Sequence, residues 1–147
     1  MKAVVLASGG LDSTVTAAVA KRDGCRVYLL TISYGQRHRV EVERARQIAM
    51  ALGAAGHLVL EVDLRPIGGS ALTADGKGIE IRAPLLHLTK AEIIRLGASL
   101  GVPFHLTHSC YDPAADGRAC GRCDSCRIRR EGFQAAGLPD PIAYAEV

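Results

Sequence analysis

The order of apolar and polar residues along the chain predicts alternating strands and helices. Short runs rich in valine, leucine and isoleucine occupy residues 2–7, 27–33 and 57–63, and the stretches at about 12–22 and 37–52 have helical spacing. Strands that alternate with helices in this way form βαβ units with parallel strands. We therefore predict an α/β fold of the Rossmann-like, doubly wound type, with a parallel sheet covered on both faces.

Two helices have well-marked ends in the sequence. In the stretch at 37–52 the apolar residues form one helical stripe, and Gly53 follows as a residue suited to end the helix. Further along, Thr89-Lys-Ala-Glu92 matches a capping box, in which the threonine and glutamate side chains bond each other's free backbone amides. The box predicts a third helix that runs to about Leu100.

Length and composition favour one cytoplasmic domain. The 147 residues suffice for a single hydrophobic core, so we predict one domain over residues 1–147. No stretch resembles a membrane span, and the N-terminus enters a strand at once, without a signal peptide. The net charge of +3 does not call for a nucleic-acid partner. We expect the arginines near the C-terminus to face solvent rather than an anionic substrate: Arg118, Arg122, Arg127, Arg129 and Arg130.

The most informative polar segment is Ser-Gly-Gly-Leu-Asp-Ser at residues 8–13, between the first strand and the first helix. Its two glycines allow consecutive backbone N–H groups to converge on an anion at a helix N-terminus, and Ser8 and Ser13 add hydroxyl donors. The spacing differs from that of a Walker A loop and from G-x-G-x-x-G. We predict a phosphate-binding loop; the alternative is a turn in which Ser8 or Asp12 only caps the helix.

Two further positions carry candidate binding groups. The turn Ser-Tyr-Gly-Gln-Arg-His at residues 33–38 follows the second strand and should lie at the same edge of the sheet. There Arg37 and His38 could bind phosphate or a carboxylate, and Tyr34 could stack on a base, unless the segment is an ordinary turn. Lys90 falls in the first turn of the third helix, where the helix dipole disfavours a cation. A phosphate partner would explain this position; a solvated lysine is the alternative.

The C-terminal part contains a C-x9-C-x2-C-x2-C array, formed by Cys110, Cys120, Cys123 and Cys126. Four thiolates at this spacing can close tetrahedrally on zinc, so we predict one structural Zn²⁺ per chain within residues 108–130. Disulfides are disfavoured without an export signal, and an iron–sulfur cluster is the main alternative. His108 could replace Cys110 as a ligand, whereas Cys25 and His105 are expected to be ordinary, partly buried residues.

Several of these motifs resemble those of a known superfamily. The loop at 8–13 resembles the PP-loop of the ATP pyrophosphatases, many of which carry a Pro-Leu…Lys-x-Glu-Ile…Leu-Gly segment similar to residues 83–97. In those enzymes the lysine of this segment contacts the ATP phosphates. The loop at 8–13 and the segment at 83–97 occur here together with the turn at 33–38, the cysteine array and the closing Asp140-Pro. This combination resembles the 7-cyano-7-deazaguanine synthase family over nearly the whole chain.

The resemblance implies a homodimeric ATP-dependent ligase that converts 7-carboxy-7-deazaguanine and ammonia to 7-cyano-7-deazaguanine, through an activated carboxylate and an amide, in queuosine biosynthesis. It implies catalytic roles for Ser8, Asp12, Ser13 and Lys90, with Asp12 helping to hold Mg²⁺. Neither a membrane nor a nucleic acid is an expected partner. The implied ATP-binding residues are Ala7, Ser8, Gly9, Gly10, Leu11, Asp12, Ser13, Thr14, Tyr34, Gln36, Arg37 and His38.

Two other functions stay open at this point. One is a PP-loop enzyme that thiolates tRNA, which would also use ATP to activate an oxygen. The other is a non-catalytic zinc-knuckle module that binds nucleic acid. The absence of Trp and the presence of only two Phe leave little for base stacking and argue against the second.

The chain also departs from the family it resembles. Members are normally several dozen residues longer before Ile79, in a stretch with Arg-Asn and Asp-Tyr-Ser-Gly-Tyr-Pro-Asp motifs associated with substrate and nucleotide binding. Residues 65–78 are glycine-rich and lack helical periodicity, whereas a parallel crossover normally needs a dozen residues or more, usually with a helix. We expect a central segment to be missing near residues 73–78, and we expect no activity if the protein truly lacks it.

Overall fold

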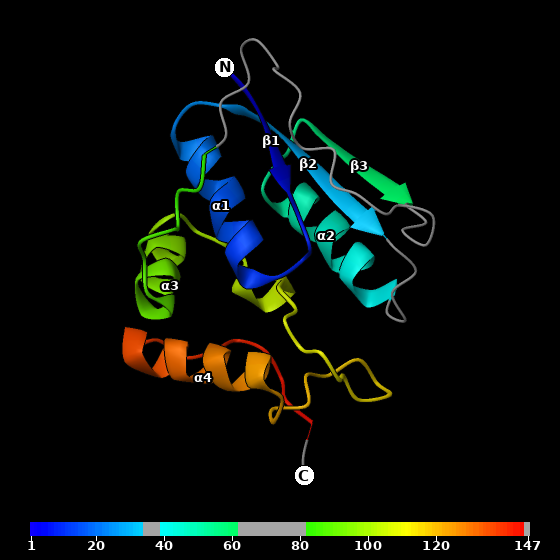
Figure 1. The fold of residues 1–147 in the computed structure, drawn as a ribbon, viewed down its shortest axis with the longest axis vertical. Helices are drawn as coiled ribbons and strands as arrows, with labels where there is room; N and C mark the ends of the chain where they lie inside the picture. The colour runs from blue at the N-terminus through cyan, green and yellow to red at the C-terminus, as the bar shows by residue number, and fades with distance from the viewer. Residues whose placement is uncertain (34–38, 62–81, 146–147) are drawn as a thin grey trace, which may run out of the picture.

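A computed structural model describes residues 1–33, 39–61 and 82–145. Strands and helices alternate at first, and helices follow (Figure 1). The elements are β1 (Lys2–Leu6), α1 (Leu11–Arg22), β2 (Arg26–Ser33), α2 (Arg39–Ala51), β3 (Gly56–Glu61), α3 (Lys90–Ser99), the 3₁₀ helix η1 (Phe104–Leu106) and α4 (Asp124–Ala136). Each strand and helix predicted from periodicity is present, although residues 37–38 and 62–63 lie outside the described ranges.

The three strands form a parallel sheet in the order β1-β2-β3. Its register places Leu6 beside Leu30 and Leu30 beside Leu58. Both crossovers contain a helix, α1 between β1 and β2, and α2 between β2 and β3. The predicted α/β fold with a parallel sheet is therefore confirmed.

Helices α1 and α2 cover the same face of this sheet. Val5 and Leu29 pack on that face against Ala17 of α1 and Ala49 of α2. Two right-handed crossovers that move in the same direction across a sheet place both helices on one side. The opposite face, called the outer face below, carries the alternate strand residues: Val4, Leu6, Tyr28, Leu30, Ile32, Leu58 and Leu60.

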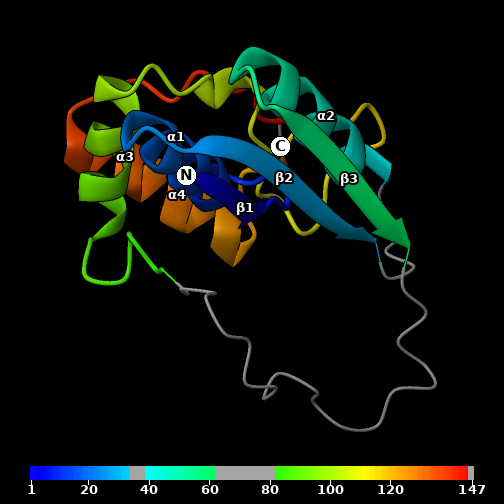
Figure 2. The same cartoon turned by 90° about the horizontal axis from the view of Figure 1, so that it is seen from above.

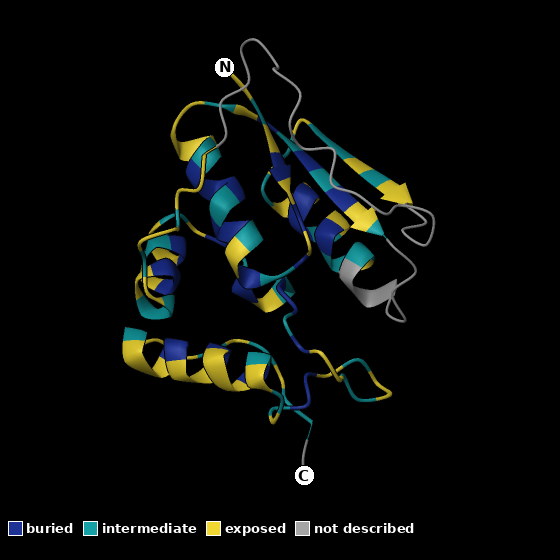
Figure 3. Cartoon of the chain, in the orientation of Figure 1, coloured by how far each residue is buried: buried dark blue, intermediate teal, exposed yellow. Residues whose placement is uncertain are grey.

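Five of these outer-face residues are exposed, and exposed positions run along all three strands in Figure 3. The expectation of a sheet covered on both faces is therefore not met among the described residues. The physical reason is topological, because cover on the outer face would have to come from a connection that follows β3.

A second hydrophobic core lies on the other side of α1. Val15 and Val19 of α1 pack there with Ile94 of α3, Phe104 of η1 and Phe133 of α4. The rings of Phe104 and Phe133 meet edge to face at 5.3 Å between centroids. Helices α3 and α4 lie side by side at the end of the molecule away from β3 (Figure 2). Within the described residues, the helices are all too short or too polar to cross a membrane.

The predicted start of α3 is confirmed in atomic detail. The backbone N–H of Glu92 donates to Oγ1 of Thr89 at 3.3 Å, and the backbone N–H of Thr89 donates to the Glu92 carboxylate at 2.7 Å. The bond from the Thr89 backbone is the main cause that lowers the pKa of Glu92. The capping box therefore makes Thr89 the N-cap and Lys90 the first residue of the helix.

The expectation that the C-terminal arginines face solvent is wrong for Arg129. Its side chain is only 3% exposed and forms an ion pair with Asp140, Nε to Oδ2 at 2.9 Å. It also donates to Oγ1 of Thr107 at 2.7 Å, and Asp140 accepts a further bond from the hydroxyl of Tyr144. Burial, followed by Asp140, raises the pKa of Tyr144 well above its ordinary value. Arg129 therefore joins α4, η1 and the C-terminal segment.

Replacing Arg129 with alanine is expected to lower the free energy of unfolding by about 3–5 kcal/mol, because Asp140 would remain buried without its cation. Chemical unfolding followed by circular dichroism measures this change. Arg127, which lies on the exposed side of α4, provides the matched control, since Arg127→Ala should shift stability by less than about 0.5 kcal/mol. Equal effects of the two substitutions would contradict the structural role given to Arg129.

Candidate functional site

The loop between β1 and α1 adopts the form expected of an anion cradle. Gly9 has a positive φ of 79°, which favours glycine, and Gly10 is the N-cap of α1. The hydroxyls of Ser8 and Ser13 lie 3.3 Å apart, and the backbone N–H of Gly10 donates to Oγ of Ser8 at 3.3 Å. Both hydroxyls are thus held beside the helix N-terminus, where the dipole favours negative charge.

Three buried residues in and beside the loop anchor it to the protein. The side chains of Ala7, Leu11 and Thr14 are buried, and the Thr14 hydroxyl donates to the carbonyl of Gly10 at 2.7 Å. These three side chains therefore face the interior, so a ligand in the loop could meet only their backbone groups. A further contact comes from the C-terminal half, where the backbone N–H of His108 donates to the carbonyl of Gly9 at 2.9 Å.

Lys90 reaches the loop from α3, 78 residues further along the chain. Its ammonium group lies 2.7 Å and 2.8 Å from the two carboxylate oxygens of Asp12. The exposed fractions of the two side chains are 27% for Lys90 and 54% for Asp12, so the pair is open to solvent. This contact explains a lysine in the first turn of a helix, because the carboxylate offsets the unfavourable dipole. The contact places Lys90 at the glycine loop, and a phosphate partner for it stays a prediction.

Gly132 of α4 makes room for the stem of Lys90. A Cβ atom at position 132 would collide with Cγ of Lys90 and would lie 3.0 Å from Cδ1 of Ile94. Gly132 is not among the site residues predicted from the sequence. A glycine in the interior of a helix, where alanine is about 1 kcal/mol better, was the available signal for a close approach.

Gly132→Ala is expected to weaken ATP binding about tenfold, because the added methyl group displaces the stem of Lys90 and with it the ammonium group. The dissociation constant for ATP, measured by calorimetry, reports this change. Gln134→Ala, at an exposed position of the same helix, should leave ATP binding unchanged. Unaltered affinity in Gly132→Ala would show that the position of Lys90 does not depend on this contact.

The second predicted binding segment lies outside the described residues. It includes Tyr34, Gln36, Arg37 and His38, and the structure places only the preceding residue, Ser33, at the end of β2. Since β1 and β2 are parallel neighbours, this end of β2 is at the same edge of the sheet as the loop at 8–13. Binding by these four residues stays a prediction.

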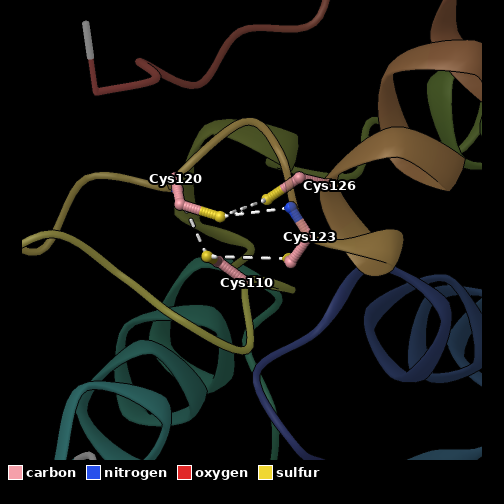
Figure 4. Close-up of side chains that lie close together, drawn as sticks. All are labelled: Cys110, Cys120, Cys123 and Cys126. Atoms are coloured by element: carbon pink, nitrogen blue, oxygen red, sulfur yellow. Dashed lines mark hydrogen bonds between the residues drawn. The ribbon is translucent and has the colours of Figure 1, made fainter. Parts of the chain in front are cut away.

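The four cysteines of the array come together in one cluster (Figure 4). Their sulfur atoms all lie within 4.8 Å of one another, and the Cys120–Cys126 and Cys110–Cys123 pairs are 4.0 Å and 3.9 Å apart. Four thiolates at about 2.3 Å from a tetrahedral zinc ion would be about 3.8 Å apart. The cluster could therefore hold one metal ion. Cys110 itself lies in the cluster, so His108 is not needed in its place.

Backbone N–H groups point at two of these sulfurs. The N–H of Cys120 donates to Sγ of Cys110 at 3.2 Å, and the N–H of Cys123 donates to Sγ of Cys120 at 3.3 Å. A bond from the backbone N–H of Arg122 is the main cause that lowers the pKa of Cys120 to about 6. Burial raises the pKa values of Cys110 and Cys126. A metal ion bound here would displace the thiol protons, because cysteine binds metals as the thiolate.

The cysteine and the histidine that we expected to be ordinary residues lie outside the cluster. Cys25, which precedes β2, is half-buried as expected and is a free thiol. His105 is exposed rather than partly buried, because it lies on the outward side of η1. It lines a pocket of about 580 Å³ between α2, η1 and the C-terminal segment. The pocket carries charges of both signs, from Glu43, Arg44, Asp116 and Arg118, and so favours no one class of ionic ligand.

Comparison with known proteins identifies the family. The family of "Queuosine biosynthesis protein QueC" matches residues 2–79 and 74–137 of the chain. The chain belongs to the QueC family. The resemblance found in the sequence is thus confirmed, and family membership favours it over the tRNA-thiolating enzyme and the nucleic-acid-binding module.

Curated relatives cover the same length. The 7-cyano-7-deazaguanine synthase of Geobacter metallireducens is 40% identical over 223 positions, which cover 99% of this chain and 94% of the relative. Those of Solidesulfovibrio magneticus and Myxococcus xanthus are 40% and 38% identical, and the alignments cover 97% and 99% of this chain and 95% and 98% of the relatives. The alignments are longer than the 147 residues of this chain, so dozens of positions in each relative have no counterpart here.

A solved structure shares the fold of this QueC family member. The NMN synthetase of Francisella tularensis superposes with a TM-score of 0.56, at 16% identity, over 92% of this chain and 77% of that chain. At this level of identity the likeness concerns the fold alone. It agrees with the Rossmann-like α/β architecture described above.

Proposed function

We propose that the chain binds ATP for the chemistry of the 7-cyano-7-deazaguanine synthases, which form 7-cyano-7-deazaguanine from 7-carboxy-7-deazaguanine and ammonia. The observation that carries the proposal is the contact of Lys90 with Asp12 at the glycine loop, in a chain 40% identical to a curated synthase. This arrangement provides a cation, a carboxylate and backbone amides at one helix N-terminus. Phosphoryl chemistry requires donors of this kind that are oriented before the charge develops.

The proposal gives the loop residues and Lys90 different roles. The backbone amides near Gly9 and Gly10, with the hydroxyls of Ser8 and Ser13, bind the pyrophosphate part of ATP. Lys90 then leaves Asp12 for the phosphate oxygens, because the phosphates carry more negative charge than one carboxylate. Asp12, freed from the lysine, helps to hold Mg²⁺, whose chemistry is to neutralise charge at the α-phosphate.

The substrate carboxylate is activated by transfer of the AMP group from ATP to one of its oxygens, with pyrophosphate as leaving group. Ammonia displaces AMP to give the amide, and a second activation allows the amide oxygen to leave as the nitrile forms. The resemblance to the family assigns the nucleotide to Tyr34, Gln36, Arg37 and His38 as well as to the loop. They follow β2 in the sequence, and the described end of β2 lies at the same edge of the sheet as the end of β1, which supports this assignment.

The cysteine cluster is proposed to hold one structural zinc ion. Four protein sulfurs leave no open position for substrate, so the ion would stabilise the fold rather than act on the substrate. The sulfur spacing near 4 Å suits a single ion better than an iron–sulfur cluster, in which the thiolates bind different irons. Metal analysis of the purified protein tests this point; iron with labile sulfide would overturn it.

The curated relatives have dozens of residues that this chain lacks, and this difference affects which steps of the reaction the chain can perform. The two parts meet at residues 74–79, where we predicted a missing segment from the sequence. We propose that the chain binds ATP through its loop, and that formation of the nitrile requires the central segment. The intact mass of the purified protein tests the premise, since a mass above 15.5 kDa would show a longer chain.

The experiment that tests the proposed function follows two products at once. The protein is incubated with α-labelled ATP, Mg²⁺ and ammonium, with and without 7-carboxy-7-deazaguanine. Substrate-dependent AMP together with the nitrile, detected by mass spectrometry, would support the full activity, and ATP binding without nitrile would support the loss of the central segment. Intact ATP without detectable ATP binding would overturn the proposal.

A further inference from the structure

A buried threonine is bonded to the residue that precedes the glycine loop at residues 8–13. Thr31 of β2 is only 4% exposed and lies on the face of the sheet that α1 and α2 cover. Its hydroxyl donates to the carbonyl of Ala7 at 2.7 Å, and the same Oγ1 lies 2.8 Å from Nε2 of His57 on β3. The two contacts therefore join the end of β1 to β2 and β3.

The donor in each of these two bonds follows from the available protons. A threonine hydroxyl carries one proton, and a backbone carbonyl can only accept, so this proton lies on the bond to Ala7. In the contact between Thr31 and His57, the Nε2–H of the ring is therefore the donor. Burial, followed by the charge of Arg46, lowers the pKa of His57, so the ring is uncharged at neutral pH and carries its single proton on Nε2.

The bond to Ala7 acts on the first peptide unit of the loop. This peptide is trans and planar, with its C=O and N–H on opposite sides, so a fixed Ala7 carbonyl also fixes the direction of the Ser8 N–H. That N–H donates to Oγ of Ser13 at 3.3 Å. The N–H of Ala7 itself donates to the carbonyl of Leu30 at 2.8 Å. Ala7 is thus held on both sides, and Thr31 acts on the Ser13 hydroxyl through one peptide plane.

The neighbours of Thr31 show that packing alone does not account for its hydroxyl. Val27 and Leu29 of the same strand and Val5 of β1 are apolar and buried on this face. A valine in place of Thr31 would have nearly the same shape and would avoid the cost of burying a hydroxyl. The hydroxyl is explained by what it bonds, since its proton goes to the residue at which the loop begins.

We propose that Thr31 and His57 are positioning residues for the glycine loop. His57 orients the hydroxyl of Thr31, and Thr31 holds the first peptide of the loop in the direction that suits phosphate binding. Thr31 is buried and acts only through the loop. For its effect on ATP, this role rests on the proposed function, in which the hydroxyls of Ser8 and Ser13 bind the pyrophosphate part.

Thr31→Val keeps the shape of the side chain and removes both bonds. We expect it to weaken ATP binding about tenfold in calorimetry, because the Ala7 carbonyl loses its partner. Thr31→Ser keeps the hydroxyl and should bind ATP within about twofold of the unmodified chain. Val27→Ala, on the same face at the other end of β2, should lower the melting temperature and leave ATP affinity unchanged, which separates positioning from stability.

Two measurements made without nucleotide separate this proposal from the proposed function. Amide hydrogen exchange of Ser8 should be at least about fivefold faster in Thr31→Val than in Val27→Ala, because the first peptide of the loop is no longer held. In the unmodified protein, nitrogen NMR of the histidine rings should show His57 with its proton on Nε2 at neutral pH. This second measurement does not depend on the folding of any variant.

A proton on Nδ1 of His57 at neutral pH would overturn the proposal. The same holds if Thr31→Val matches Val27→Ala in ATP affinity and in Ser8 exchange, or if Thr31→Ser behaves like Thr31→Val. An unmodified chain that binds no ATP would overturn the proposed function alone. Faster exchange of Ser8 in Thr31→Val would still support the positioning of the loop by Thr31.

Discussion

Replacing Lys90 with alanine is expected to reduce substrate-dependent AMP formation by about 10²- to 10³-fold. The ammonium group lies 2.7 Å from Asp12 at the glycine loop, and the proposed function gives it the role of stabilising charge on the α-phosphate. Its removal takes away an interaction that strengthens as this charge develops, so kcat should fall more than KM rises. The release of labelled AMP measures the effect.

Two further variants test whether the loss of activity is specific to the site formed by Lys90 and Asp12. Lys21→Ala removes a lysine of α1 that donates to the carbonyl of Leu52, far from the loop, and should retain full activity. Asp12→Asn should also lower activity, and it should shift the Mg²⁺ concentration needed for half-maximal rate if Asp12 helps to hold the ion. A Lys90→Ala protein with unchanged kcat would show that the contact with Asp12 has a structural role only.

Loss of a single cysteine of the cluster is expected to remove the metal and to destabilise the C-terminal part. Cys126→Ser should contain less than stoichiometric zinc and should unfold about 10–15 °C lower, which corresponds to about 3–5 kcal/mol for a domain of this size. Cys126 is buried beside the other three ligands, so its replacement leaves an incomplete site in the interior. Metal analysis and thermal unfolding provide the two measurements.

The fifth cysteine provides a matched control. Cys25 is a free thiol outside the cluster, so Cys25→Ser should keep the metal and change stability by less than about 1 kcal/mol. A chelator should lower the melting temperature of the Cys25→Ser protein but not that of Cys126→Ser. Stoichiometric metal in Cys126→Ser would contradict the four-cysteine site.

The cysteine cluster is connected to the glycine loop and to Lys90 in two ways. Cys123 is the N-cap of α4, the helix whose Gly132 touches Lys90. Two residues before Cys110, the backbone of His108 holds the carbonyl of Gly9 in the loop. Weaker ATP binding in Cys126→Ser would therefore be expected alongside the loss of stability.

The parts of the site that sequence reasoning predicted depend on residues close together in the chain. The glycine loop, the capping box at Thr89 and the C-x2-C spacing each combine backbone geometry with side chains fewer than a dozen residues apart. The strands and helices likewise follow local periodicity, and their observed bounds differ by few residues from the predicted ones. Family resemblance added the identity of the reaction, which no local pattern contains.

By itself, then, the sequence determined which segments are strands and helices, where the glycine loop lies and which four cysteines come together. Only the tertiary structure decided that Lys90 meets Asp12, that Arg129 is buried on Asp140 while Arg127 stays exposed, and that the described residues cover one face of the sheet and not the other. The physical reason is that local spacing fixes hydrogen bonds within an element. The partner of a charge or an apolar face depends on which distant elements pack together.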